Sequence, residues 1–149
     1  MATIYEHALQ DLAEFIGLPH PELLPDTQEL VIGDHHIGFA FDAHDVNEPV
    51  AGDILFFCTL GHIDAARETA TYRLLLEANN LWSGTGGAVL GMQRDTGMVT
   101  LAARLPLEGL QPSHFAEVLS AFADTADFWA GALKGDHIVQ SQSDVSLRV

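Results

Sequence analysis

The chain has 149 residues, 48% of them hydrophobic, and its 21 acidic residues against 6 basic residues give a formal net charge of −15. This length and apolar content are typical of one folded domain and argue against global disorder. The negative charge argues against nucleic acid and anionic membranes as partners, because these polyanions bind basic surfaces. The sequence has no apolar run near the ~20 residues that span a bilayer and no secretory signal, so we expect a cytoplasmic protein without membrane insertion.

The first predicted element is a helix that begins after Thr3, because Thr3 and Glu6 fit a capping box. Gly17 and the prolines that follow it predict the end of this helix and an irregular linker over residues 18–27. Apolar residues at helical spacing predict the buried face of the helix, namely Ile4, Ala8, Leu12, Phe15 and Ile16.

Three strands are predicted next, over residues 29–32, 37–43 and 53–60. The second of them alternates, with Ile37, Phe39 and Phe41 on one face. The third is apolar on both faces, so we expect it to lie centrally or to be covered on both sides. Its Cys58, the only cysteine, is predicted to be a buried thiol rather than a nucleophile, because no cationic group other than His62 is near it in the sequence.

A second helix is predicted over residues 64–80, with Asp64 as its N-cap. Two apolar stripes run along this helix, and a small chain has few surfaces against which both could be buried. A partner subunit would supply the missing surface. The predicted dimer-interface residues are Ala66, Ala70, Leu74 and Leu75.

The rest of the chain predicts a hairpin and a long helix. Strands over residues 87–93 and 98–105 are joined by a turn at 94–97 that ends in glycine. A helix follows from Ser113, its N-cap, to Gly135, and the polar tail 136–149 is predicted to be flexible. The order αβββαββα predicts an α+β fold, a twisted antiparallel sheet packed by helices, in one domain over residues 1–135.

The sequence offers little chemistry for catalysis. Residues 83–87 are rich in glycine, but they lead from a helix into a strand and no lysine follows, so they do not fit a phosphate loop. Histidines flank the second predicted strand, at 35–36 and at 44. The two ends of this strand lie some 20 Å apart, so the histidines at its opposite ends cannot bind one metal ion together. We therefore predict no enzymatic activity, metal or cofactor. A small metal-dependent hydrolase that uses the histidines stays open as an alternative.

The second half contains a series of short motifs: LLEAN at 75–79, GTGGA at 84–88, LG at 90–91, DTG at 95–97, LPL at 105–107 and FADTADFW at 122–129. Together they resemble the motifs of the class I type III secretion chaperones of the Tir-chaperone (CesT) family. The first half agrees in the order of its elements and in the phrase LAEFIGLP at 12–19.

The resemblance implies an acidic bacterial cytoplasmic homodimer that binds the N-terminal region of one or more secreted effectors and keeps them soluble and competent for secretion. It also implies dimerisation through the second helix, partner strands added to the sheet edge, and the secretion ATPase as a further partner. A regulatory protein that sequesters a secretion factor on the same surface stays open. Amphipathicity and the family together predict effector contacts at Leu12, Phe15, Ile16, Ile37, Phe39 and Phe41.

Overall fold

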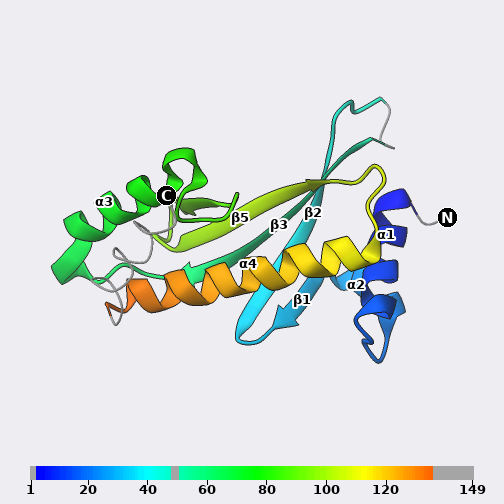
Figure 1. Ribbon diagram of the computed structural model, residues 1–149, viewed down its shortest axis with the longest axis horizontal. Helices are drawn as coiled ribbons and strands as arrows, with labels where there is room; N and C mark the ends of the chain where they lie inside the picture. Colours follow the sequence, from blue (N-terminus) through cyan, green and yellow to red (C-terminus); the bar gives the residue numbers. More distant parts are fainter. Residues whose placement is uncertain (1–2, 48–50, 136–149) are drawn as a thin grey trace. The chain divides into compact units, whose positions relative to one another are not determined.

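The computed structural model of the chain describes residues 3–47 and 51–135 (Figure 1). Its α-helices are α1 (Ile4–Phe15), α2 (Leu24–Thr27), α3 (Glu68–Asn79) and α4 (Pro112–Leu133). Its 3-10 turns are η1 (Pro21–Leu23), η2 (Ala65–Arg67) and η3 (Asn80–Trp82). Its strands are β1 (Glu29–Ile32), β2 (His35–Ala43), β3 (Gly52–Gly61), β4 (Val89–Met92) and β5 (Val99–Pro106). The tail 136–149 lies outside the described residues, so its predicted flexibility and the domain boundary at 135 stay predictions.

The strands form one five-stranded sheet in the order β1-β2-β3-β5-β4. The pairs β1–β2, β2–β3 and β4–β5 are antiparallel. The predicted α+β class is confirmed, and so is the central place of the third strand. Within residues 3–47 and 51–135, no helix has both the length and the apolar content needed to cross a bilayer.

The chain divides into two compact units. Unit 1 comprises Met1–Phe57 and Arg104–Ala121, and unit 2 comprises Cys58–Ala103 and Phe122–Val149. The strands β3 and β5 and the helix α4 each begin in one unit and end in the other.

Helix α1 buries a different face from the one predicted. Thr3 caps it as expected, since its hydroxyl accepts a hydrogen bond from the Glu6 N–H at 3.1 Å. Of the predicted face, however, Ile4, Phe15 and Ile16 are exposed. The buried residues are Tyr5, Leu9, Leu12 and Ala13. The tyrosine decides the face, because its hydroxyl donates to Gln28 Oε1 at 2.8 Å and its ring stacks on Phe41.

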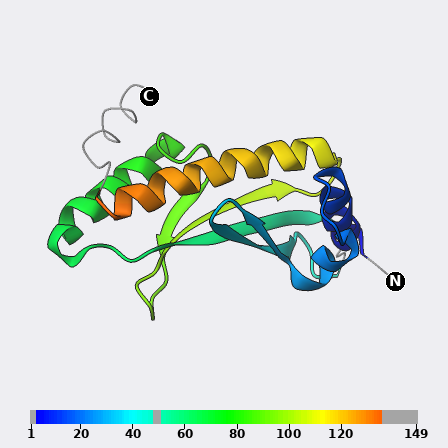
Figure 2. The ribbon, with the colours of Figure 1, turned by 90° about the horizontal axis from the view of Figure 1, so that it is seen from below.

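The proline-rich linker is also more regular than predicted. It forms the turn η1 and the short helix α2, which lie beside α1 in unit 1 (Figures 1 and 2). The prediction was wrong because Pro21 and Pro25 occupy the first turn of these helices, where a missing N–H breaks no intrahelical bond. Gln28 then ends α2 in the left-handed conformation.

The core of unit 1 is completed by the first half of α4. Phe115 is 1% exposed and meets Phe39 edge to face, with ring centroids 5.9 Å apart. The helix begins at Pro112 rather than after Ser113. Proline is favoured at a first helical position because its φ is already helical.

Unit 2 is built around Trp129, whose side chain is fully buried. Its indole N–H donates to the Gly84 carbonyl at 2.9 Å. A β-carbon at Gly84 would come within 2.8 Å of the Ala78 β-carbon, so only glycine lets this loop approach the helices so closely.

The start of the second predicted helix is a 3-10 turn. Asp64 caps it by accepting from the Ala66 N–H at 3.1 Å, and this bond, together with Arg67, lowers the pKa of Asp64. The Arg67 guanidinium also donates to the Lys134 carbonyl at 3.1 Å, at the end of α4.

Candidate partner-binding surfaces

The edge of the sheet at β1 has backbone groups with no hydrogen-bond partner among the described residues. In the β1–β2 ladder Leu30 is opposite Ile37, and the Phe39 N–H donates to the Gln28 carbonyl at 3.0 Å. Backbone groups alternate in direction along an antiparallel strand, so those of Glu29 and Val31 point away from β2. Both residues are exposed, and Val31 keeps 55% of its surface. This edge can accept another strand.

The opposite edge, at β4, is closed at its centre. Leu90 is opposite Leu101 in the β4–β5 ladder, and its backbone groups point outward. There they meet the side chain of Asn79, at the end of α3. The Asn79 amide donates to the Leu90 carbonyl at 2.9 Å, and the Leu90 N–H donates to Asn79 Oδ1 at 2.9 Å. The carboxamide therefore takes the place of a neighbouring strand.

The predicted effector-contact residues fall into two groups in the structure. Phe15 and Ile16 are 58% and 40% exposed, whereas Leu12, Ile37 and Phe39 are core residues of unit 1 and Phe41 is half-buried beneath Tyr5. Contact with an effector stays a prediction for the whole set. Phe15 and Ile16 are therefore the members of the set that are most accessible to a partner.

The predicted dimer residues also divide by exposure. Leu74 and Leu75 are buried inside unit 2, while Ala66 and Ala70 are exposed. Their role in an interface stays a prediction. Among the described residues, every exposed large apolar side chain of unit 2 comes from α3, η3 or β4. They are Tyr72, Leu76, Leu81, Trp82, Val89 and Met92. We call the four on α3 and η3, namely Tyr72, Leu76, Leu81 and Trp82, the unit 2 patch.

The backbone of the unit 2 patch is unusual at two positions. Leu81 and Trp82 have φ values of 53° and 57°, a left-handed conformation that side chains other than Asn and Asp rarely adopt. These residues expose 80% and 56% of their surfaces. Two large apolar side chains held outward on strained backbone are typical of a contact surface. The sequence pattern does not predict that Leu81 and Trp82 are exposed, because they fall where the periodic pattern of α3 ends.

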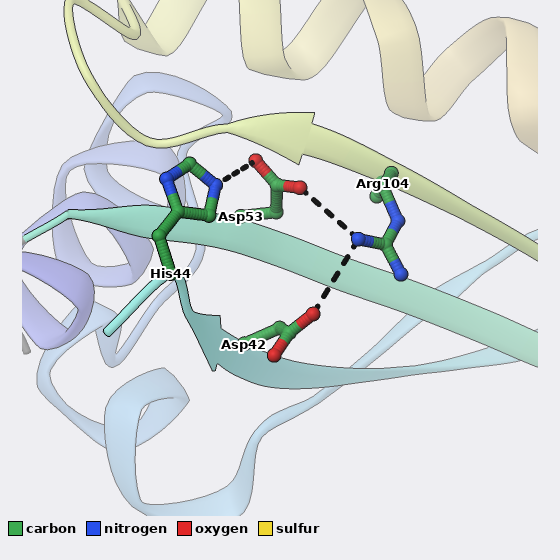
Figure 3. A network of polar contacts seen from close by, with 4 residues as sticks. All are labelled: Asp42, His44, Asp53 and Arg104. Carbon is green, nitrogen blue, oxygen red and sulfur yellow. Dashed lines mark hydrogen bonds and ion pairs between the residues drawn. The ribbon is translucent and has the colours of Figure 1, made fainter. Parts of the chain in front are cut away.

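A polar network joins β2, β3 and β5 in unit 1, together with His44 directly after β2 (Figure 3). Asp42 and Asp53 are directly opposite each other across β2 and β3, which brings two negative charges together. Arg104 bridges them, with Nη1 3.4 Å from Asp42 Oδ2 and 3.2 Å from Asp53 Oδ2. His44 Nε2 lies 3.3 Å from the other oxygen of Asp53. Arg104 therefore offsets a repulsion that the register creates.

The other candidate chemical groups have local partners. His36 Nδ1 lies 2.6 Å from Glu29 Oε1, and His44 contacts Asp53 as described. Across the described part of the chain, no group of three or more His, Cys, Asp or Glu side chains could hold a metal ion. Cys58 is 2% exposed, and burial raises its pKa to about 11, so the prediction of a buried thiol is confirmed.

Three comparisons with known proteins bear on this geometry. A model of the Tir chaperone protein (CesT) family matches residues 7–130. No curated protein matches the sequence.

Solved structures share the fold, and three of them are described here by their chains. A chain of the HopA1–SchA chaperone–effector complex has a TM-score of 0.60 and 15% identity, over 85% of this chain and 93% of that chain. A chain of the ExoT–SpcS complex from Pseudomonas aeruginosa has a TM-score of 0.57 and 24% identity, over 85% and 97%. A chain of the ExsC–ExsE complex has a TM-score of 0.55 and 21% identity, over 87% and 92%. With the family match over most of its length, the chain belongs to the Tir chaperone protein (CesT) family.

Proposed function

We propose that this protein is a type III secretion chaperone that binds the N-terminal region of one or more effector proteins and keeps them soluble and competent for secretion. The observation that carries the proposal is the family match over residues 7–130. The similarity in fold to a chain of a chaperone–effector complex supports it. We assign the protein to the bacterial cytoplasm, where a chaperone of this kind meets its effector before export. We assign it no enzymatic activity, and the secretion ATPase would be its further partner.

The proposed effector surface lies on unit 1. It combines the exposed pair Phe15 and Ile16 on α1 with Leu23, which is 50% exposed, and with the open edge at β1. Exposed apolar side chains and an open strand edge in the same unit suit an extended segment, because the backbone supplies affinity and the side-chain pockets supply selectivity.

The proposed homodimer uses unit 2. The unit 2 patch offers large apolar side chains, among them Leu76 at 72% exposure, for burial against a second copy. Trp82 is a tryptophan, a residue type that often contributes much of the binding energy of a protein interface.

The effector proposal is tested by purification from the native host with mass spectrometry of the bound proteins. We expect a secreted effector to copurify, and the Phe15→Asp variant to lose most of it. Val46→Asp is the control, since Val46 is also an exposed apolar residue of unit 1 (87%) and lies outside the proposed surface. Recovery of a secretion regulator instead of an effector would favour the sequestering alternative. Equal effector recovery with both variants would remove Phe15 from the surface.

The dimer proposal is tested by light scattering. We expect the wild-type mass to equal two subunits and the Leu76→Asp and Trp82→Asp variants to be monomers, because an unpaired charge in an interface costs several kcal/mol. Phe15→Asp serves as the control and should stay dimeric. A dimer that survives both unit 2 substitutions would contradict the assignment.

A further inference from the structure

The negative charge of the chain is distributed unevenly between its two units. Unit 1 contains thirteen Asp and Glu residues but one Arg and no Lys, which gives it a formal charge of −12. Unit 2 contains eight acidic and five basic residues, which leave it at −3. Helix α1 therefore belongs to the strongly acidic unit.

A row of apolar residues runs along the side of α1 that does not face the core. Ile4, Ala8 and Phe15 are separated by four and seven residues, spacings that place side chains on one side of a helix. Ile4 and Phe15 expose 52% and 58% of their surfaces, and Ala8 is half-buried. Other residues of α1 form its buried face, so packing inside unit 1 does not account for this row. An exposed apolar row on a helix about 18 Å long suits burial against another helix.

A second row, which carries the charge, lies beside the apolar one. His7, Asp11 and Glu14 are exposed and are four and three residues apart, so they also share one side of the helix. Asp11 follows Ala8 by three residues and precedes Phe15 by four, which makes the two rows neighbours on the helix surface. We call the two rows together the outer face of α1.

The carboxylates of the outer face have no cationic partner from Lys or Arg among the described residues. Arg104, the one arginine of unit 1, already contacts both Asp42 and Asp53 (Figure 3). Glu14 accepts a hydrogen bond from a neutral glutamine amide one turn earlier, at 3.2 Å. Asp11 and Glu14 therefore keep their charge for a cation from another molecule.

We propose that the outer face of α1 binds an amphipathic helix of the partner in which large apolar residues lie beside a row of Lys or Arg. The apolar residues of this helix pack against Ile4, Ala8 and Phe15, and its basic side chains reach Asp11 and Glu14. A second copy of this chain does not fit the same face, because it would bring like charges together. The inference rests on the proposed function, and it adds a helical element and its charge to the effector region that the protein would bind.

The probe is a fluorescent peptide of about eighteen residues made of leucine, lysine and alanine, long enough to form a helix. Its lysines flank a single row of leucines. The matched control has the same composition but carries its lysines on the face opposite the leucines, so general attraction to an acidic protein is equal for both. Fluorescence anisotropy follows binding to the full chain. We expect the first peptide to bind at least about tenfold more tightly, with a Kd that rises as salt is added and with a gain of helical circular dichroism on binding.

Two double variants test the acidic row. Asp11→Asn with Glu14→Gln removes its charge without reversing it and should weaken the first peptide several-fold. Asp34→Asn with Glu117→Gln removes the same charge from exposed positions of unit 1 outside α1 and should leave binding unchanged. The same effect of both variants would overturn the placement on α1.

Two single variants test the apolar row. Ile4→Ser should also weaken the first peptide several-fold, by a factor that depends little on salt, because it removes apolar contact and no charge. Val31→Ser is the matched control, since Val31 is a branched apolar residue of unit 1 with 55% exposure that lies outside α1. Thermal melting verifies that each variant is folded.

The outcomes separate this inference from the proposed function. Equal binding of the two peptides would overturn the inference, because it would show attraction to the overall charge instead of recognition of two neighbouring rows. If an effector copurifies from the native host while the first peptide does not bind, the inference fails and the proposed function stands. If the first peptide binds at α1 but no secreted protein copurifies, the proposed function fails instead.

Discussion

The two edge strands of the sheet, β1 and β4, have four residues each but finish their hydrogen bonding differently. At β4 the outward groups of Leu90 are bonded to the Asn79 carboxamide, and the outward N–H of Ala88 donates to the Thr85 carbonyl at 3.2 Å. At β1 the outward groups of Glu29 and Val31 have no such partner within residues 3–47 and 51–135. An exposed edge invites aggregation, so proteins usually protect it. In the part of the chain that the structure describes, this protection is present at β4 and not at β1, which supports the proposal that β1 receives a partner.

The difference in charge follows the same division. The open edge belongs to the unit at −12, and the closed edge to the unit at −3. Repulsion between like charges discourages copies of unit 1 from pairing through β1, as charged edges do in many sheet proteins. The acidity of unit 1 can therefore protect the open edge against identical chains while leaving it available to basic ones.

Proline substitution at the two edges should give the largest contrast. Leu90→Pro removes an N–H that is bonded to Asn79 and truncates a side chain that is 5% exposed, so we expect a loss of at least about 3 kcal/mol in the free energy of unfolding. Val31→Pro removes an N–H that points to solvent and should cost less than about 1 kcal/mol. Urea unfolding of both variants measures the difference. Equal losses would mean that β1 is not an open edge.

Asn79→Ala should have a smaller effect. It leaves both outward groups of Leu90 without their partner, and an unsatisfied backbone group costs about 1–3 kcal/mol when water cannot replace the bond fully. It should also open the β4 edge to strand addition, visible as concentration-dependent aggregation. Asn80→Ala, at the neighbouring exposed asparagine, is the control. A variant as stable and as monodisperse as the wild type would remove the edge-closing role of Asn79.

Arg104→Gln should have the smallest effect of the three. Arg104 and Asp42 are exposed, whereas Asp53 keeps 14% of its side-chain surface, so the two ion pairs together contribute on the order of 1 kcal/mol. The substitution also leaves the directly opposed Asp42 and Asp53 without the cation between them. We expect the loss to shrink at high salt, and the double variant Arg104→Gln with Asp42→Asn to recover most of it. Urea unfolding at two salt concentrations measures both. A loss that is independent of salt would point to packing of the arginine stem instead of charge.

The sequence predicted the strands well and the edges not at all. Alternation of Ile37, Phe39 and Phe41 and the apolar run of β3 marked the sheet, because each pattern reflects burial of that strand alone. The edge closure depends on Asn79, eleven residues before Leu90, and a polar residue at a helix end has many local partners to choose from. The sequence pattern around Asn79 does not distinguish Leu90 from these other possible partners.

The predicted binding residues show the same limit. The stripe of α1 was assigned from spacing, and Leu12 satisfied both the predicted and the observed face. Tyr5 decided the outcome through its bond to Gln28, twenty-three residues later in the chain. The left-handed backbone conformation of Leu81 and Trp82 could not be predicted from the sequence either, since this conformation is expected of glycine and asparagine but not of leucine and tryptophan.

The connectivity of the two units limits how the chain can be divided. Because β3, β5 and α4 each pass from one unit to the other, unit 1 consists of two segments that are separated in the sequence by most of unit 2. A single truncation at any point would leave at least one unit incomplete. A hybrid that takes its partner preference from a related chain would therefore have to exchange both segments of unit 1 together, with the junctions placed inside the two strands and the long helix.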